Sequence, residues 1–153
     1  MPSASRSITA NVPADHFFET VTDYESYPEF IPETVAVEVT KKGKKTKDGS
    51  KTDDVKFSIK VIKKIDYTLR LTSNADEHSV NWELVDGPFK SNNGSWEIKA
   101  AGKGKTEATY TVDITMGFLV PQSITNMLVG SSLPKMLEQM KERAESTYTK
   151  SKK

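Results

Sequence analysis

Strict alternation of apolar and polar residues between positions 108 and 118 restricts the fold of this chain more than any other feature. Every second residue in this segment is apolar: Ala108, Tyr110, Val112, Ile114, Met116 and Phe118. Side chains of a β-strand point alternately to its two faces, so the pattern predicts a strand with one buried and one exposed face. A single strand cannot bury its own apolar face, and we therefore expect further strands and a layer that covers them.

The same alternation recurs near the N-terminus and in five segments between residues 33 and 100. The inward residues expected from it are Ile8, Ala10 and Val12; Val35, Val37 and Val39; Val55, Phe57, Ile59 and Val61; Ile65, Tyr67, Leu69 and Leu71; Val80, Trp82 and Leu84; and Trp96, Ile98 and Ala100. We interpret Asp86-Gly87-Pro88 as a hairpin tip and Asn93-Gly94 as a bulge in the strand that follows. The chain is thus expected to form seven antiparallel strands, six of them consecutive.

A short amphipathic helix is expected directly after the first strand. Phe17, Val21 and Tyr24 fall on one face of a helix whose first turn holds Pro13. The next segment, YPEFIP at 27–32, contains two prolines and disfavours continuation of this helix.

The last long apolar stretch, 121–148, is the large amphipathic element that remains to cover the sheet. One stripe at helical spacing comprises Leu133, Met136, Leu137, Met140, Ala144 and Tyr148. An earlier stripe comprises Ile124, Met127 and Leu128. On a straight helix the two stripes would lie about 140° apart, and Pro134, which cannot bond the carbonyl of Gly130, predicts a kink between them. A sheet curved around such a helix leaves a wedge in which apolar ligands bind.

Composition limits the classes of function. The length of 153 residues fits one domain, 1–153, with residues 1–5 and 150–153 expected to be disordered. A formal net charge of +1 argues against a DNA-binding protein. With no cysteine and two histidines, we expect neither a disulfide nor a metal site. No apolar run approaches the length of about 18 residues that a membrane helix requires, so a cytoplasmic protein is expected.

Three motifs resemble one known superfamily. They are DYESYPEFIP at 23–32, GPFK at 87–90 followed by Trp96, and LP at 133–134 leading into KERAE at 141–145. Together they resemble the START-like (SRPBCC, helix-grip) superfamily, in its branch of polyketide cyclase/dehydrase and coenzyme Q-binding-type proteins, which includes the bacterial ribosome-association toxin. The resemblance implies an α+β helix-grip fold, in which a curved seven-stranded antiparallel sheet wraps around a long kinked C-terminal helix, with one or two short helices after strand 1. It also implies an apolar internal cavity.

At two positions the chain departs from the quinone-binding members of that branch. These members commonly carry Trp where this chain has Glu33, and Leu where it has Asn92. Either departure makes the expected cavity less purely apolar.

The residues expected to line a ligand site are large apolar side chains of the inward face. They are Phe17, Tyr27, Phe30, Phe57, Tyr67, Trp82, Trp96, Tyr110, Met116, Met127, Leu128, Met136 and Met140. Each of them alone could simply be a core residue, but the group exceeds what one helix can fill, and aromatic walls suit a flat ligand. We expect a bound quinone, isoprenoid or lipid as ligand and no other cofactor.

The candidates for catalysis are few, and the sequence favours a binding protein over an enzyme. His78 and Tyr67 share the inward phase and are weak candidates for acid or base chemistry. No Ser/His/Asp arrangement, phosphate-binding loop or HExxH motif is present. A polyketide cyclase-like enzyme remains an alternative hypothesis.

A run of lysines is expected at the tip of the hairpin that joins the strands at 33–41 and 54–62: Lys41, Lys42, Lys44, Lys45, Lys47 and Lys51. Such a tip is usually just solvated. Alternatively it could dock to an anionic membrane surface, which would make the protein peripheral at the membrane, or to the phosphates of the ribosome.

Overall fold

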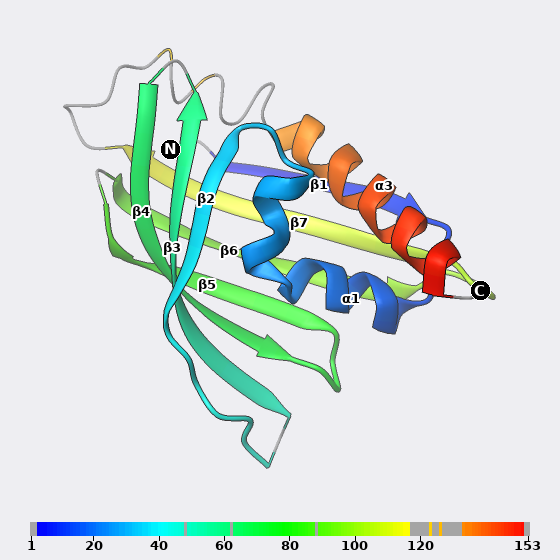
Figure 1. Ribbon diagram of the computed structural model, residues 1–153. Helices are drawn as coiled ribbons and strands as arrows, with labels where there is room; N and C mark the ends of the chain where they lie inside the picture. The colour runs from blue at the N-terminus through cyan, green and yellow to red at the C-terminus, as the bar shows by residue number, and fades with distance from the viewer. Residues whose placement is uncertain are drawn as a thin grey trace.

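The computed structural model describes residues 3–47, 49–61, 63–87, 89–116, 123, 126 and 133–151. One strand, two short helical segments, six further strands and a long helix follow one another (Figure 1), so the predicted order of elements is confirmed. The elements are β1 Ser3–Ala10, α1 Ala14–Thr22, η1 Tyr24–Glu29 (a 3-10 helix), β2 Thr34–Lys41, β3 Ser50–Val61, β4 Lys63–Asn74, β5 Ser79–Asp86, β6 Phe89–Ala100, β7 Thr106–Met116 and α3 Leu133–Ser151.

Within the described residues, seven strands form one antiparallel sheet in the order β1-β7-β6-β5-β4-β3-β2. The predicted six-strand meander is therefore confirmed, and β1 is added at its far edge next to β7. Ser3 pairs with Asp113, so residues 3–5, expected to be disordered, belong to the sheet because β7 provides their backbone partners. At the other end of the chain α3 includes position 150 and extends to Ser151, which corrects the same expectation there.

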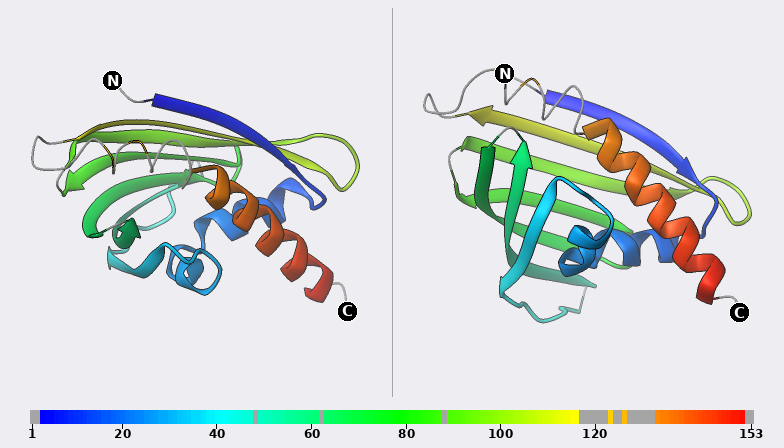
Figure 2. Two further views of the ribbon diagram at one scale, coloured as in Figure 1. Left: turned by 90° about the horizontal axis from the view of Figure 1, so that it is seen from above. Right: turned by 45° about the horizontal axis from the view of Figure 1, so that its top comes forward.

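The helical elements lie together on one face of the sheet, which curves around them (Figure 2). α3 packs against β1 and α1, and η1 packs against β2. Leu137, Met140 and Ala144 of α3 are buried, as the helical stripe predicts, while Met136 and Tyr148 are partly buried against the same core. The apolar side of α3 thus covers the sheet.

The predicted kink of the C-terminal helix concerns residues outside the described part of the chain. The structure does not describe Gly130 or the stripe of Ile124, Met127 and Leu128, and it does not describe the side chain of Leu133. The kink remains a prediction.

α1 and η1 follow from the pattern of the N-terminal segment. Pro13 stands one position before the helix rather than within its first turn. Phe17, Val21 and Tyr24 are all buried, as predicted. Pro28 lies inside η1, and the tighter 3-10 geometry of this short segment replaces the α-helix that the prolines disfavour.

Most inward residues expected from the alternation are buried in the core. These are Ala10, Val12, Val55, Phe57, Ile59, Ile65, Leu69, Leu71, Val80, Trp82, Trp96, Ile98, Ala108, Val112 and Ile114. Ala100 is exposed instead, because it lies at the end of β6 next to the turn around Gly102. The side chains of Val61 and Met116, and residue Phe118, lie outside the described part.

β2 buries fewer residues than expected. Val37 and Val39 are partly buried, but Val35 is 52 % exposed. The pairing of β2 with β3 shifts register between Thr34 and Ala36, and such a bulge places an extra residue out of the alternation. The prediction for Val35 is therefore wrong, and Thr34 is buried at this end of the strand.

The bulge expected at Asn93-Gly94 lies elsewhere in β6. Both residues pair with β7 in regular register, and the register shift of that ladder lies between Phe89 and Ser91. Gly94 has a different role, since a Cβ atom there would lie 2.3 Å from Cζ2 of Trp82. Glycine at this position lets the Trp82 indole lie directly against the strand.

Candidate functional site: an aromatic cavity under the helices

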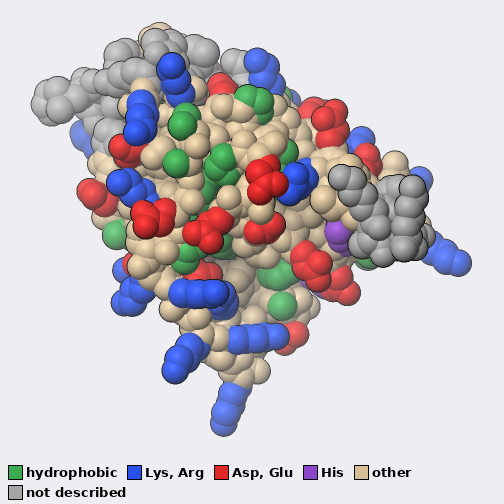
Figure 3. Space-filling model, viewed as in Figure 1, with side chains coloured by type: hydrophobic (Ala, Val, Ile, Leu, Met, Phe, Trp, Pro, Cys, Tyr) green, Lys and Arg blue, Asp and Glu red, His purple; other side chains and the backbone are tan. Residues whose placement is uncertain are grey.

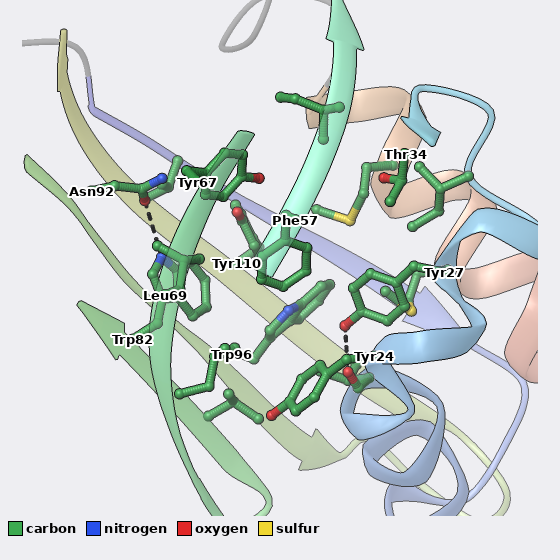
Figure 4. A pocket seen from close by; sticks show the side chains of 18 of the residues that line it. Tyr24, Tyr27, Thr34, Phe57, Tyr67, Leu69, Trp82, Asn92, Trp96 and Tyr110 are labelled. Atoms are coloured by element: carbon green, nitrogen blue, oxygen red, sulfur yellow. Dashed lines mark hydrogen bonds between the residues drawn. The ribbon is translucent and has the colours of Figure 1, made fainter. Parts of the chain in front are cut away.

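A cavity of about 160 Å³ lies between the sheet and the helical layer (Figure 4). Its walls come from α1, η1, strands β2 to β7 and α3, and the lining side chains are those of Val21, Tyr24, Tyr27, Ile31, Glu33, Thr34, Phe57, Ile59, Tyr67, Leu69, Leu71, Val80, Trp82, Asn92, Trp96, Tyr110, Val112, Ile114, Met136 and Met140. An apolar cavity of roughly 150 Å³ in another protein stays dry and accepts benzene. The cavity here is therefore large enough for a small ring system.

Aromatic side chains from five neighbouring strands form the sheet side of this cavity. Phe57 and Tyr67 are opposite one another in the β3–β4 ladder, and their rings stack with centroids 5.4 Å apart. Trp96 and Tyr110 are opposite in the β6–β7 ladder, with centroids 5.0 Å apart. The Trp82 ring lies 5.2 Å from that of Tyr110. This arrangement follows from the period-2 pattern, which sends every one of these rings to the same face.

A polar pair interrupts the aromatic wall. The indole Nε1 of Trp82 donates a hydrogen bond to Oδ1 of Asn92 over 3.2 Å. Asn92 is buried, with 5 % of its surface exposed. A buried amide is stable where its polar atoms have partners, and here the indole N–H satisfies the oxygen. Asn92 thus adds a fixed polar group to an otherwise apolar wall.

Two tyrosines of η1 form the helical side of the cavity, and their hydroxyl groups differ. Their ring centroids lie 6.0 Å apart in an edge-to-face arrangement, and Figure 4 shows both side chains on the helical side of the cavity. The hydroxyl of Tyr27 donates to the carbonyl oxygen of Val21, one of the last carbonyls of α1, which have no partner within the helix. The hydroxyl of Tyr24 is buried and has no hydrogen-bond partner among the described residues.

Burial keeps the phenols of the cavity neutral. It raises the pKa of Tyr67 and of Tyr110 above the ordinary value of 10.0, with a further contribution from Tyr67 to the pKa of Tyr110. Burial also raises the pKa of Tyr24, to which the nearby Asp53 carboxylate adds, and the pKa of Tyr27. At neutral pH these groups can donate hydrogen bonds, but they cannot serve as phenolate bases.

The structure brings together many of the residues expected at the ligand site. Those that line the cavity are Tyr27, Phe57, Tyr67, Trp82, Trp96, Tyr110, Met136 and Met140. Met127 and Leu128 and the side chain of Met116 lie outside the described residues. For the remaining two the structure differs from the expectation. Phe17 is fully buried behind the wall with its ring edge-on to Trp96, and Phe30 packs under the guanidinium of Arg143, 5.1 Å from its ring centre.

His78 does not reach the cavity. Its φ of +52° places it in a left-handed turn before β5, where the alternation from which its inward phase was inferred no longer applies. Its Nε2 lies 2.5 Å from Oδ1 of Asp15, and its ring contacts that of Phe18. Of the two weak catalytic candidates, the structure therefore places Tyr67 alone in the cavity wall.

Sequence reasoning missed Tyr24 and Thr34 as lining residues, and it included Asn92 only as a departure from the quinone-binding pattern. Both Thr34 and Asn92 are polar and so fall outside the expected set of large apolar side chains, although Asn92 has the same phase as Trp96 in its strand. For Tyr24 the helical pattern predicts a core position in the short helix, which does not distinguish a filled core from a cavity wall. Glu33 also lines the cavity, so both positions that depart from the quinone-binding pattern face the same space.

The predicted lysine-rich tip is the loop between β2 and β3, where Lys and Arg side chains project from the lower end of the molecule (Figure 3). The exposed lysines are Lys41, Lys42, Lys44, Lys45 and Lys47. Lys51 differs, because it is partly buried and its Nζ lies 3.7 Å from Oδ1 of Asp53. We therefore separate Lys51 from the surface formed by the other five.

Among the residues that the structure describes, no three His, Asp or Glu side chains come together in a way that could hold a metal ion. No helix in this described part of the chain is long and apolar enough to cross a membrane.

The chain belongs to the polyketide cyclase/dehydrase and lipid transport family, which it matches over residues 10–141. The predicted START-like, polyketide cyclase-like assignment is thereby confirmed, and with it a fold that binds small hydrophobic ligands. Assignment to the coenzyme Q-binding branch stays a prediction.

Two relatives of known sequence are bacterial toxins. The chain is 30 % identical over 115 residues to the persistence and stress-resistance toxin PasT of Escherichia coli O6:H1, a match that covers 74 % of this chain and 68 % of that protein. It is 34 % identical over 100 residues to the ribosome association toxin RatA of Escherichia coli K12. That match covers 64 % of this chain and 58 % of RatA, less than two thirds of its length.

Solved structures agree with the helix-grip fold. The Zhui aromatase/cyclase from Streptomyces sp. R1128 superposes with a TM-score of 0.81 at 19 % identity, covering 94 % of this chain and 93 % of its own. A START superfamily protein from Mycobacterium smegmatis superposes with a TM-score of 0.78 at 18 % identity, covering 95 % and 98 %. At these identities the similarity shows the fold alone.

Proposed function

We propose that this protein is a non-enzymatic carrier that holds a small apolar molecule with a ring system, of the quinone, isoprenoid or lipid type, in the cavity between sheet and helices. The observation that carries the proposal is the aromatic wall of Phe57, Tyr67, Trp82, Trp96 and Tyr110 around an unfilled space of about 160 Å³. Close packing is the rule in protein interiors, so a space of this size inside a core points to an occupant.

The polar groups of the cavity support binding rather than catalysis. Glu33 is the lining residue that carries a carboxylate, and the described part of the chain places no imidazole beside it. General acid–base chemistry needs an acid and a base that both reach the substrate. The neutral phenols and Asn92 can instead orient a carbonyl or hydroxyl oxygen of a ligand by hydrogen bonds.

A matched pair of substitutions tests this function. Leu69 lines the cavity and Ile98 is equally buried on the sheet but does not line it. Leu69→Phe extends into empty space, so we expect nearly unchanged stability and loss of binding of 2-naphthol, a two-ring probe, measured by calorimetry after removal of bound lipid. Ile98→Phe overpacks a filled region and should cost roughly 1–3 kcal/mol of unfolding free energy while binding is retained.

The opposite pattern, in which Leu69→Phe binds the probe as the wild type does, would reject the cavity as the ligand site. Turnover of a polyketide substrate that is abolished by Tyr67→Phe would instead favour the cyclase-like alternative.

A second candidate function is association with the ribosome through the loop between β2 and β3, which we call the lysine loop. Two observations favour it. The five exposed lysines lie at the end of β2 and in the loop that follows it. One relative, to which the chain is 34 % identical over 100 residues, is a ribosome association toxin. Contacts between lysines and phosphates give salt-dependent affinity without sequence preference.

Charge reversal with a matched control tests this candidate. Replacing Lys42, Lys44 and Lys47 by Glu should abolish co-sedimentation with ribosomes. Replacing three exposed lysines of the β6–β7 end, Lys99, Lys103 and Lys105, changes the net charge equally and should leave it intact. Equal loss in both variants would indicate non-specific attraction and contradict a docking role for this loop.

A further inference from the structure

Tyr24 is shared by the aromatic cavity and a second pocket, since it is a lining residue of both. The two spaces therefore meet at this side chain. The second pocket has a volume of about 210 Å³ and lies between α1, the lysine loop and the adjoining ends of β3 and β4. Its lining residues are Phe18, Thr22, Tyr24, Lys45, Gly49, Lys51, Asp53, Ser73 and Ala75.

Backbone hydrogen bonds hold the loop that forms one wall of this second pocket. The amide of Thr46 donates to the carbonyl of Ser50 over 2.8 Å, and the amide of Ala75 donates to the carbonyl of Gly49 over 3.2 Å. Gly49 has a φ of +87°, which lets the loop turn back toward the β4–β5 connection. The lysine loop is therefore folded against the sheet end rather than extended away from it.

The charged side chains of the second pocket include one more positive than negative group. Asp53 is 5 % exposed, and its Oδ1 accepts from the amide of Gly43 over 2.9 Å and lies 3.7 Å from the ammonium of Lys51. Lys45 forms no ion pair with any described residue. Two ammonium groups thus face one carboxylate, which suits a ligand group with one negative charge.

The hydroxyl groups of the pocket leave one free donor. The hydroxyl of Thr22 donates to backbone carbonyls of its own helix, and that of Ser73 donates to the carbonyl of Lys51. The hydroxyl of Tyr24 has no partner among the residues that the structure describes, although Tyr24 is 95 % buried. A buried hydroxyl without a partner is costly, so a ligand atom that accepts a hydrogen bond from it would be favoured there.

We propose that the second pocket binds the carboxylate of an amphiphilic ligand whose apolar ring-bearing part occupies the aromatic cavity, with Tyr24 as hydrogen-bond donor and Lys45 as counter-ion. The proposal rests on the proposed function and adds a ligand class to it: a monoanionic acid with a flat apolar body.

Two probes that differ in charge test the proposal. The acid 4-(2-naphthyl)butanoate and its neutral primary amide are titrated by calorimetry into the protein after removal of bound lipid. The acid should bind about tenfold more tightly than the amide. A hydrogen bond or ion pair that involves a charged carboxylate contributes more free energy than the hydrogen bond of a neutral amide does. Lys45→Ala should remove about that tenfold advantage and leave amide binding within about twofold.

Variants of neighbouring residues provide the controls. Lys47→Ala lies on the same loop but does not line the pocket, and it should change neither affinity. Tyr24→Phe should weaken acid and amide alike, by about fivefold, since both probes offer an acceptor oxygen. Equal binding of acid and amide by the wild type, or equal effects of Lys45→Ala and Lys47→Ala, would reject the second pocket as a carboxylate site. The proposed function would then still stand. Failure of both probes to bind would contradict both.

Discussion

The two tyrosines of η1 allow one substitution to be made twice with opposite expected effects. Tyr27→Phe removes a hydroxyl that donates to the carbonyl of Val21, and leaves that carbonyl without its partner. A buried group that loses its hydrogen bond costs about 1–2 kcal/mol, so the unfolding free energy should fall by that amount. Tyr24→Phe removes a hydroxyl that no other described residue pairs with. Its desolvation cost disappears, and the unfolding free energy of the ligand-free protein should rise by about 1 kcal/mol.

The assay is urea denaturation of both variants after removal of bound lipid, followed by the fluorescence of Trp82 and Trp96. The urea midpoints of the two variants should lie on opposite sides of the wild-type midpoint. In thermal unfolding, their melting temperatures should differ from that of the wild type by roughly 2–4 °C per kcal/mol for a chain of this size. A shift of both variants in the same direction, or a loss for Tyr24→Phe as large as that for Tyr27→Phe, would refute the argument. It would mean that the hydroxyl of Tyr24 is satisfied in the ligand-free protein.

Three further predictions concern the sheet, the alkaline limit of stability and the cation above Phe30. Gly94→Ala should destabilise the protein by about 3 kcal/mol, measured by urea denaturation, because the added Cβ would overlap Trp82; an unchanged midpoint would contradict the packing described. Burial raises the pKa of Tyr67 above 10.0, so the unfolded state loses this proton at lower pH than the folded state does. The contribution of this protonated phenol to the unfolding free energy should therefore be fully present below pH 10.0 and be lost progressively above it. Tyr67→Phe should make the alkaline loss, followed by circular dichroism, less steep, and an identical profile would refute the assignment. Arg143→Gln removes a cation that lies over the ring of Phe30 and donates a hydrogen bond to Glu29. This change should lower the unfolding free energy by about 1 kcal/mol. An unchanged urea midpoint would show that this partly exposed contact contributes nothing.

The strands could be predicted from the sequence because a half-buried sheet leaves a direct record in alternate residues. The segment around Val55, Phe57 and Ile59 has no other physical interpretation than a strand with one buried face, and the same argument places Tyr67, Trp82 and Tyr110 on a common wall. The helical stripe of α3 was equally direct, since Leu137, Met140 and Ala144 recur at the period of a helix.

The remaining features depend on backbone geometry that alternation does not encode. A bulge before Ala36 exposes Val35, and a left-handed turn takes His78 out of the sheet. Neither leaves a mark in the spacing of apolar residues. The buried polar groups were missed for a related reason: a hydroxyl such as that of Tyr24 is recognisable as unpaired only when every neighbouring donor and acceptor is placed.

The central claim is that the aromatic cavity is a ligand site, and two methionines in its wall can report on this directly. Met136 and Met140 of α3 both line the cavity. In protein labelled with ¹³C at the methionine methyl groups and freed of lipid, titration with 2-naphthol should shift the resonances of both residues in a saturable manner, at the concentration at which calorimetry detects binding. Saturable binding by calorimetry with both methyl resonances unmoved would place the ligand elsewhere and contradict the account.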